Sequence, residues 1–238
     1  QVENRKEKMI DAPDGLQMDP GYPPHRQKRE DERDDWRTPD HIWNTLDDRF
    51  NFTGDACAGG ENALAIRYFT PEGHVYLPQP PNRLNNTAPR EAKRTAMPGG
   101  ALTMGWDSLG GSVFMNPPYS ATKDFVKRAL GQVRLRKTNG VVCLVPATTD
   151  VKWFHEVSRS ASEIWFYEGR ISFIHPDSEE PRNGNPVGSM LLVFQYGKFG
   201  KTRLGSISSK TGLPAGERDL HYWIQHSETS PRQLRIVD

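Results

Sequence analysis

The sequence predicts an α/β protein with a mostly parallel sheet that is covered by helices on both faces. Segments with the character of strands alternate along the chain with segments of helical hydrophobic spacing. Two strand segments, residues 111–116 and 141–146, are almost continuously apolar, as expected of strands buried on both faces. Asp55 and Asn116 follow strand segments, and the ligands of parallel α/β sheets bind beyond the carboxyl ends of the strands.

The pattern begins with a helix and a strand. Thr38 is expected to cap a helix whose first residue is Pro39, because the first position of a helix needs no backbone N–H. The apolar residues that follow at helical spacing form one buried face: Ile42, Trp43, Leu46 and Phe50. Residues 50–58 predict a strand that ends in a turn of small residues at 58–60.

The pattern resumes after the strand at 111–116. Ser120 is expected to cap a helix, whose buried face is formed by Phe125, Val126, Ala129, Leu130 and Val133. The strand at 141–146 precedes a helix through Trp153, Phe154 and Val157. Two further strands are expected at 163–168 and 189–196, and the polar loop between them, 176–187, carries Arg182, Asn183 and Gly184.

Three parts of the chain differ in composition. Residues 1–35 hold seven Lys and Arg against ten Asp and Glu with little hydrophobic periodicity, which predicts a flexible charged segment. Residues 36–196 are expected to form the folded domain, with an irregular insertion at about 71–100 that holds six prolines. Residues 197–238 are expected to form a basic C-terminal extension. Such a local basic patch can attract phosphate although the net charge is only +1.

Composition excludes several classes of protein. No run of about 18 apolar residues occurs, so no membrane span is predicted, and residues 1–19 lack the apolar region of a secretory signal. Cys57 and Cys143 cannot form a zinc framework, and the seven histidines show no metal-binding spacing, so no metal is expected. These features are typical of a reduced, cytoplasmic protein.

The motif Asn116-Pro117-Pro118-Tyr119 carries the most specific chemistry. The prolines fix two φ angles and remove two N–H donors, which leaves carbonyls pointing where the turn directs them. The Asn116 amide oxygen and the Pro117 carbonyl suit a planar NH₂ group with two donors. Holding both hydrogens localises the lone pair of the amine for attack on a methyl sulfonium, and Tyr119 offers a face for a flipped base. The alternative is that the prolines only end a strand and Tyr119 only packs.

A second group of residues is suited to a cofactor. Small residues after a strand let the backbone approach a ligand, and an acid such as Asp55 can bind the amino group of the cofactor. Asp107 could contact the adenine ring of the cofactor or start an ordinary turn. Arg170, near the end of an apolar strand, could contact a phosphate or the target base, or pair with an acid.

Seven blocks of sequence, taken in order, resemble the phage-type DNA adenine-N6 methyltransferase (Dam-like) family. They are DWRTP at 35–39, DACAGGEN at 55–62, RYFTPE at 67–72, WD at 106–107, FMNPPYS at 114–120, VCLVPATTDVKWFH at 142–155 and EGRISF at 168–173. Each block alone is unspecific, but seven in order form a specific signal over roughly residues 35–196. The turn after Asp55 lacks the FxGxG spacing that is common in other methyltransferases.

The resemblance implies a Rossmann-like S-adenosylmethionine-dependent methyltransferase fold that transfers a methyl group from S-adenosylmethionine to a flipped adenine in double-stranded DNA. The cofactor-binding residues would be Trp36, Thr38, Pro39, Asp55, Ala56, Cys57, Ala58, Asn62, Asp107 and Asn116. The DNA-binding residues would be Tyr119, Ser120, Lys123, Arg170, Ser172, Arg182 and Asn183. The resemblance also implies a phage protein that acts in the cytoplasm of a bacterial host, in a restriction–modification setting. A monomer is favoured, and only the Dam-like name suggests GATC as the recognition site.

Other acceptors remain open from the residues alone. The same acceptor geometry suits the N4 amine of cytosine in DNA, a glutamine side chain of a protein, or an amine of RNA. A catalytically silent DNA-binding protein of the same fold is a further alternative.

Overall fold

The computed structural model describes residues 36–58, 63–65, 67–70, 100–175, 178–182 and 185–227, together with the backbone of 73–76 and 93–95. The predicted flexible segment at 1–35, most of the insertion at about 71–100, and the candidate residues Asn62 and Asn183 lie outside the described residues.

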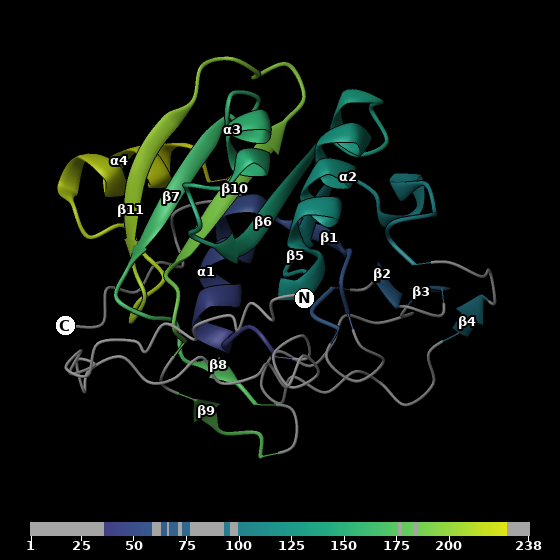
Figure 1. The fold of residues 1–238 in the computed structure, drawn as a ribbon, viewed down its shortest axis with the longest axis horizontal. Coiled ribbons are helices and arrows are strands. Elements are labelled where there is room, and N and C mark those ends of the chain that lie inside the picture. The colour runs from purple at the N-terminus through teal and green to yellow at the C-terminus, as the bar shows by residue number, and fades with distance from the viewer. Residues whose placement is uncertain are drawn as a thin grey trace, which may run out of the picture.

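The described residues form a nine-stranded sheet (Figure 1). From one edge to the other the strands are β11 (Arg203–Ser208), β7 (Glu163–Glu168), β10 (Ser189–Gln195), β6 (Gly140–Pro146), β5 (Ser112–Met115), β1 (Phe52–Asp55), β2 (Arg67–Thr70), β3 (Gly73–Tyr76) and β4 (Lys93–Thr95). Strands β1, β2, β5, β6, β7 and β11 run in one direction, whereas β10 lies antiparallel between β6 and β7. The predicted α/β class with a mostly parallel sheet is therefore confirmed.

Helices cover both faces of this sheet. They are α1 (Asp40–Phe50), α2 (Thr122–Arg134), α3 (Lys152–Ser158) and α4 (Glu217–Gln225), with short 3₁₀ helices η1 (Trp106–Leu109) and η2 (Tyr119–Ala121). One hydrophobic cluster joins α2 and α3 to the sheet, and the other joins α1 and α4 to it. Along β6, Cys143 belongs to the first cluster and its neighbours Val142 and Leu144 to the second, because successive side chains of a strand point to opposite faces.

Helix α1 presents the predicted buried face but begins differently from the prediction. Its buried residues include Ile42, Trp43, Leu46 and Phe50. The helix starts at Asp40, so Pro39 is the N-cap, and no side chain caps it. The predicted Thr38 cap is wrong, because the Pro39 carbonyl accepts the first backbone N–H groups and the Thr38 hydroxyl accepts a hydrogen bond from Asn116 instead.

Helix α2 likewise begins later than predicted. The buried face is confirmed for Val126, Ala129, Leu130 and Val133. The predicted Ser120 cap is wrong, because η2 occupies this position and α2 begins at Thr122 without a side-chain cap. The Thr122 hydroxyl donates to the carbonyl of Pro118 (3.3 Å) or to that of Tyr119 (3.2 Å). This bond fixes the start of the helix to the turn at residues 116–119, called the Pro-Pro turn below.

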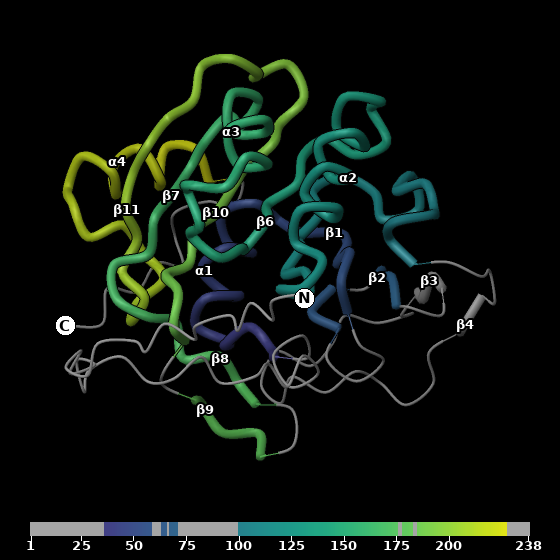
Figure 2. Tube along the Cα trace, in the orientation of Figure 1, coloured from purple at the N-terminus to yellow at the C-terminus, as the bar shows by residue number. Residues whose placement is uncertain are grey.

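A small hairpin follows β7 at the carboxyl ends of the parallel strands. It consists of β8 (Phe173–Ile174) and β9 (Pro181–Arg182), and it is separate from the main sheet (Figure 2). The Arg37 N–H donates to the Ile174 carbonyl at 3.0 Å, and the Ile174 N–H donates to the Arg37 carbonyl at 3.0 Å. The hairpin thus holds the chain segment that leads into α1.

The sheet continues beyond residue 196, where the sequence suggested that the folded domain ends. Strand β11 pairs in parallel with β7, and α4 returns to pack Trp223, 1% exposed, into the core. Arg203 of β11 pairs with Asp219 of α4 at 2.7 Å. The described part of the segment from 197 onward is therefore built into the α/β sheet.

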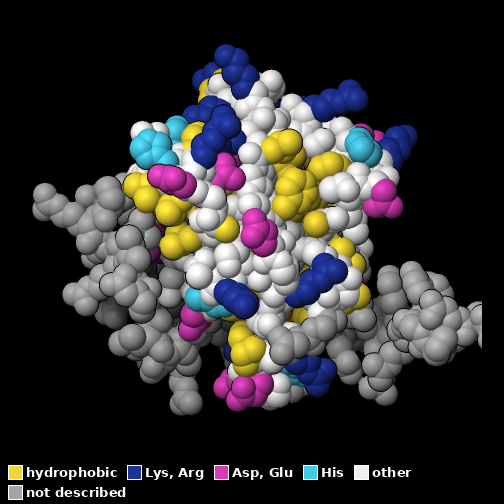
Figure 3. All heavy atoms as spheres, turned by 90° about the vertical axis from the view of Figure 1, so that its left-hand side faces the viewer, with side chains coloured by type: hydrophobic (Ala, Val, Ile, Leu, Met, Phe, Trp, Pro, Cys, Tyr) yellow, Lys and Arg dark blue, Asp and Glu magenta, His cyan; other side chains and the backbone are white. Residues whose placement is uncertain are grey.

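The face formed by α4 and β11 mixes charge with apolar surface (Figure 3). Side chains of both signs lie between hydrophobic patches there, and Leu204 of β11 is 63% exposed.

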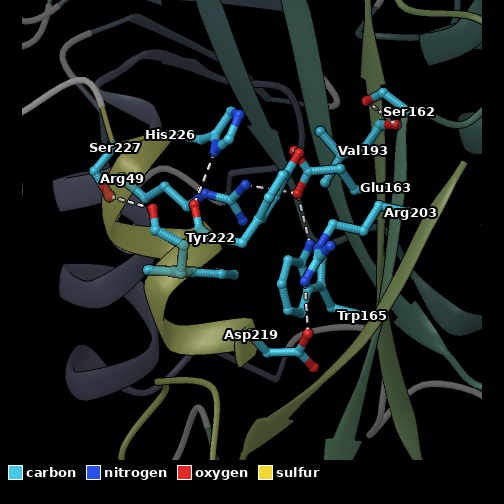
Figure 4. A network of polar contacts seen from close by, with 11 residues as sticks. Arg49, Ser162, Glu163, Trp165, Val193, Arg203, Asp219, Tyr222, His226 and Ser227 are labelled. Carbon is cyan, nitrogen blue, oxygen red and sulfur yellow. Dashed lines mark hydrogen bonds and ion pairs between the residues drawn. The ribbon is translucent and has the colours of Figure 1, made fainter. Parts of the chain in front are cut away.

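A buried ion pair joins α1 to the first residue of β7 (Figure 4). Arg49 Nη2 lies 2.6 Å from Glu163 Oε2, and the two side chains are 1% and 4% exposed. Trp165 Nε1 donates to the same carboxylate at 2.7 Å, and the Tyr222 hydroxyl donates to it at 3.3 Å. The Arg49 guanidinium also stacks over Trp223, 4.0 Å from the ring centroid. This network links α1, β7 and α4 at the amino ends of the parallel strands, opposite their carboxyl ends.

Gly54 allows η1 to pack closely on β1. A Cβ atom at this position would lie 2.6 Å from Leu109 Cβ and 2.9 Å from the Leu109 carbonyl oxygen.

We expect Gly54→Ala to lower the free energy of unfolding by about 1–3 kcal/mol, as overpacking of a core does. Gly131→Ala on α2 is the control, because its added Cβ would have no atom within 4 Å apart from its chain neighbours and the backbone of its own helix, and helices favour alanine. Urea denaturation would show opposite signs for the two variants, and a neutral Gly54→Ala would contradict the close packing.

Candidate active site

A cavity of about 430 Å³ opens at the carboxyl ends of β1, β2 and β5. This volume is within the range of small-molecule sites. The cavity brings together seven of the predicted cofactor-binding residues: Trp36, Thr38, Asp55, Ala56, Cys57, Ala58 and Asn116. They come from the segment before α1 (residues 36–39), from the carboxyl end of β1 and from the carboxyl end of β5.

Asp55 supplies a buried carboxylate at the last position of β1. It is 3% exposed, and the Cys57 N–H donates to its Oδ1 at 3.0 Å. Burial raises the pKa of Asp55 from 3.8 to about 6, while hydrogen bonds from the backbone of Cys57 and Leu64 partly offset this rise. A cation placed in the cavity would favour the charged carboxylate, so the residue suits a positively charged ligand group.

Trp36 contributes a donor that lacks an acceptor among the described residues. Its indole Nε1 is buried and has no hydrogen-bond partner there, although the residue lines the cavity. Buried polar groups are normally paired, so an unpaired donor beside a cavity fits a ligand with an acceptor. Trp36 and Asp55 together therefore suit a ligand that carries both a hydrogen-bond acceptor and a cationic group.

The Asn116 side chain is held by the segment before α1. Its Nδ2 donates to the Trp36 carbonyl at 3.4 Å or to the Thr38 hydroxyl at 3.2 Å. A carbonyl can only accept, so the amide nitrogen must face Trp36 and the amide oxygen must point elsewhere. Within the described part of the chain no side chain or backbone N–H donates to that oxygen, which leaves an acceptor at the cavity.

The rest of the Pro-Pro turn is braced from two sides. The Asn185 Nδ2 donates to the Tyr119 hydroxyl at 3.0 Å, and Asn185 itself is only 3% exposed. The Tyr119 ring meets the ring of Phe173 edge-on, with centroids 6.5 Å apart. Phe173 of β8 also contacts the Trp36 ring, at a centroid distance of 6.4 Å. One buried phenylalanine therefore supports both the cavity wall and the turn.

Two predicted cofactor residues lie elsewhere. The Asp107 side chain is 60% exposed, and its carboxylate pairs with Lys137 Nζ at 3.0 Å instead of lining the cavity. The reason is local: Trp106 is fully buried at the start of η1, so its neighbour Asp107 points outward. Pro39 is buried at the N-cap of α1 and does not line the cavity either.

The predicted DNA-binding residues that the structure describes lie around the carboxyl ends of the strands. Ser120 and Lys123 are exposed near the start of α2, and Arg182 is exposed on β9. Arg170 is exposed after β7, and its guanidinium approaches Gly188, the residue just before β10. Ser172 is half-buried just before β8. None of these positions by itself shows contact with DNA.

Sequence reasoning missed several residues of the cavity wall. They are Arg37, Leu64, Phe69, Thr70, residues 100–103, Phe114, Pro118 as a wall residue, and Phe125. Phe69 and Thr70 could have been found, because they end β2, which pairs with β1 next to Asp55. Residues 100–103 carry no comparable signal, since only the tertiary structure brings them to the cavity.

Other chemistry has no support among the described residues. Burial raises the pKa of the Cys57 thiol well above its usual range, which opposes a role as a thiolate nucleophile. In the part of the chain that the structure describes, no group of three His, Cys, Asp or Glu side chains could hold a metal ion. None of the described helices has the length and apolar character that crossing a membrane requires.

Comparisons with known proteins bear directly on this site. The family model described as DNA N-6-adenine-methyltransferase (Dam) matches residues 25–77 and 92–218. A DNA N-6-adenine-methyltransferase of Haemophilus phage HP1 is 30% identical over 184 residues, which cover 76% of this chain and 87% of the relative. One of Escherichia phage T1 is 26% identical over 187 residues, which cover 72% of this chain and 66% of the relative, just under two thirds.

A solved structure of a predicted O-methyltransferase from Agrobacterium tumefaciens is also similar. It is 20% identical, covers 41% of this chain and 40% of its own, and has a TM-score of 0.25, too low to bear on the fold. The match to the family model is much more extensive, because it includes more than half of the chain and all the residues that line the cavity. The chain belongs to the Dam family of DNA N-6-adenine-methyltransferases, as the sequence blocks predicted.

Proposed function

We propose that this protein transfers a methyl group from S-adenosylmethionine to the N6 amine of a flipped adenine in double-stranded DNA. Family membership already implies a methyl donor and a DNA substrate, and the proposal specifies both. The observation that carries it is the Asn116 amide beside a cavity of cofactor size. Its nitrogen faces Trp36 and Thr38, while its oxygen has no donor among the described residues.

The chain's own groups suit the chemistry of an aromatic amine. An aromatic amine is a poor nucleophile because its lone pair is delocalised into the ring. The Asn116 oxygen and the Pro117 carbonyl would accept its two hydrogens and so favour a tetrahedral nitrogen with a localised lone pair. Tyr119, with its hydroxyl held by Asn185, would present a fixed ring for the base to stack on.

The cavity residues suit the proposed methyl donor. Asp55 would bind its amino group, and Trp36 would donate to an acceptor such as its carboxylate. Small side chains at Ala56 and Ala58 would allow the ligand to approach the backbone after β1. When bound, S-adenosylmethionine supplies the electrophilic methyl group on a sulfonium.

DNA would approach from the carboxyl ends of the strands, where the predicted DNA-binding side chains lie. Arg170, Arg182 and Lys123 would contact phosphates or base edges there. The flipped base would enter beside Tyr119, because an exocyclic amine inside a duplex cannot otherwise reach a buried site.

Transfer of a labelled methyl group from S-adenosylmethionine tests this proposal. The acceptors are duplex DNA, RNA and protein, and digestion of the DNA to nucleosides distinguishes N6-methyladenine from N4-methylcytosine. We expect the label in N6-methyladenine. Label only in cytosine, RNA or protein, or no transfer at all, would exclude the proposed reaction. Single-molecule sequencing of DNA from expressing cells would then read the recognition site and test the GATC suggestion.

The raised pKa of Asp55 predicts a pH-dependent affinity for the cofactor. Without a ligand, its contribution to stability is fully present below about pH 4 and is lost as the pH rises through about 6. A bound cation favours the carboxylate, so binding releases about half a proton at about pH 6 and nearly one at about pH 5. The affinity should therefore rise about tenfold between about pH 5 and pH 7. Titration calorimetry in buffers of different ionisation enthalpy measures both the affinity and the proton release.

Two variants control this experiment. Asp55→Asn should bind the cofactor more weakly and without the change in affinity over this range. Asp107→Asn should behave like the parent protein, because the Asp107 carboxylate pairs with Lys137 outside the cavity. An unchanged pH profile in Asp55→Asn would remove Asp55 from the cofactor site.

A further inference from the structure

Thr38 lies where it can control the direction of the Asn116 amide. The two residues are 78 positions apart in sequence, yet their side chains meet at 3.2 Å. Thr38 is 2% exposed, and it lines the cavity together with Asn116. An amide can rotate about its last bond and exchange the positions of nitrogen and oxygen, so a fixed direction requires fixed partners.

The first fixed partner is the Trp36 carbonyl. Because β8 holds Arg37 by two backbone hydrogen bonds of 3.0 Å, the preceding carbonyl is fixed relative to the hairpin. The contact between the Trp36 and Phe173 rings restrains the same segment on its other side. A carbonyl oxygen repels the amide oxygen and accepts from the amide nitrogen, so it distinguishes the two orientations.

The second fixed partner is the Thr38 hydroxyl. A residue before a proline is restricted to extended backbone, and Thr38 precedes Pro39, so its position has little freedom. The buried side chain of a β-branched residue has few rotamers as well. Thr38 and the Trp36 carbonyl thus offer two acceptors to the two hydrogens of one amide nitrogen.

We propose that Thr38 is a positioning residue for methyl transfer, which acts with the Trp36 carbonyl to keep the Asn116 oxygen turned toward the target amine. This rests on the proposed function of Asn116. It assigns Thr38 a role beyond cofactor contact: the hydroxyl lowers the population of the rotated amide, in which a nitrogen donor would face the donor hydrogens of the substrate. The expected effect is on the rate of transfer at saturating cofactor and DNA.

A double-mutant cycle tests the role. Thr38→Val keeps the shape of the side chain but removes the hydroxyl, and should slow single-turnover transfer at saturating cofactor about fivefold to tenfold. Thr38→Ser should restore most of the rate. In an Asn116→Ala background, Thr38→Val should change the residual rate less than about twofold, because no amide remains to be oriented.

Two features keep the outcomes separate. Thr45→Val on α1 is a matched control, since Thr45 bonds the His41 carbonyl and lies outside the cavity wall, and it should leave the rate unchanged. Thr38→Val that slows transfer equally with and without Asn116, or that changes only the KM for the cofactor, would overturn the positioning role. The rates are measured on whichever amine the parent protein methylates, so an acceptor other than adenine would contradict the proposed function alone. A parent protein that methylates no amine would overturn both.

Discussion

Asn116→Ala should lower the rate of methyl transfer by about 10²-fold or more while cofactor binding stays within a few-fold. The variant removes a side-chain acceptor that has no donor among the described residues, whereas Asp55 and Trp36 keep their places in the cavity wall. The loss is specific to the transition state, because the acceptor matters most when the amine nitrogen becomes tetrahedral. Single-turnover transfer to duplex DNA gives the rate, and titration calorimetry gives the affinity for the cofactor.

Asn44→Ala provides the matched control for this variant. Asn44 lies on α1 and is not part of the cavity wall, so the same chemical change there should leave both quantities as in the parent protein. Equal rates for Asn116→Ala and the parent protein would rule out the catalytic role of the amide. A large loss of cofactor affinity in Asn116→Ala would instead move the residue from the acceptor site to the cofactor site.

Glu163→Gln should lower the free energy of unfolding by about 3–5 kcal/mol. Glu163 is the counter-charge of Arg49, and both side chains are almost completely buried. Desolvation lowers the pKa of Arg49 and the charge of Glu163 opposes this effect, so the guanidinium depends on that carboxylate. Two further nitrogens of Arg49, Nε and Nη1, already lack partners among the described residues. Removing the charge of Glu163 therefore leaves a buried cation without compensation. Urea denaturation followed by circular dichroism measures the change.

An exposed ion pair gives the comparison for this measurement. Lys127 and Glu156 pair on the surface with side chains 42% and 41% exposed, so Lys127→Ala should cost less than about 1 kcal/mol. If Glu163→Gln costs no more than Lys127→Ala, the buried network does not hold α4 and α1 on the sheet. Methyl transfer by the folded fraction should be unchanged, because Glu163 begins β7 whereas the cavity lies where the parallel strands end.

Local sequence patterns predicted the main helices and strands, and they placed the candidate site at the carboxyl ends of the parallel strands. The buried faces of α1 and α2 follow from spacing within a dozen residues, and the apolar runs at β5 and β6 follow from burial on both faces. Asp55 and Asn116 could be placed together because the neighbouring parallel strands β1 and β5 have their carboxyl ends side by side. These signals depend only on neighbours in the sequence and on one topological rule.

The errors of prediction share one physical cause. Thr38 and Ser120 are good capping residues by type, but the hydroxyl of Thr38 has a partner 78 residues away, and a 3₁₀ turn displaces the start of α2. Asp107 was a candidate by position, but the burial of Trp106 turns it outward. In each case the packing of the folded chain decided where the side chain lies, and for the two predicted caps it outweighed a local preference worth about 1 kcal/mol.

The sequence by itself determined the α/β class and the family, because each depends on residue types in local patterns, and it predicted an amine-binding role for the Asn116 motif. The tertiary structure alone decided which groups surround that motif. Long-range contacts place Thr38 against Asn116, Asn185 against Tyr119, and Arg49 against Glu163, and no spacing along the chain encodes them. The direction of the Asn116 amide, on which the proposed reaction depends, is a property of the packed structure, because its partners come together only when the segment before α1 is held against β8.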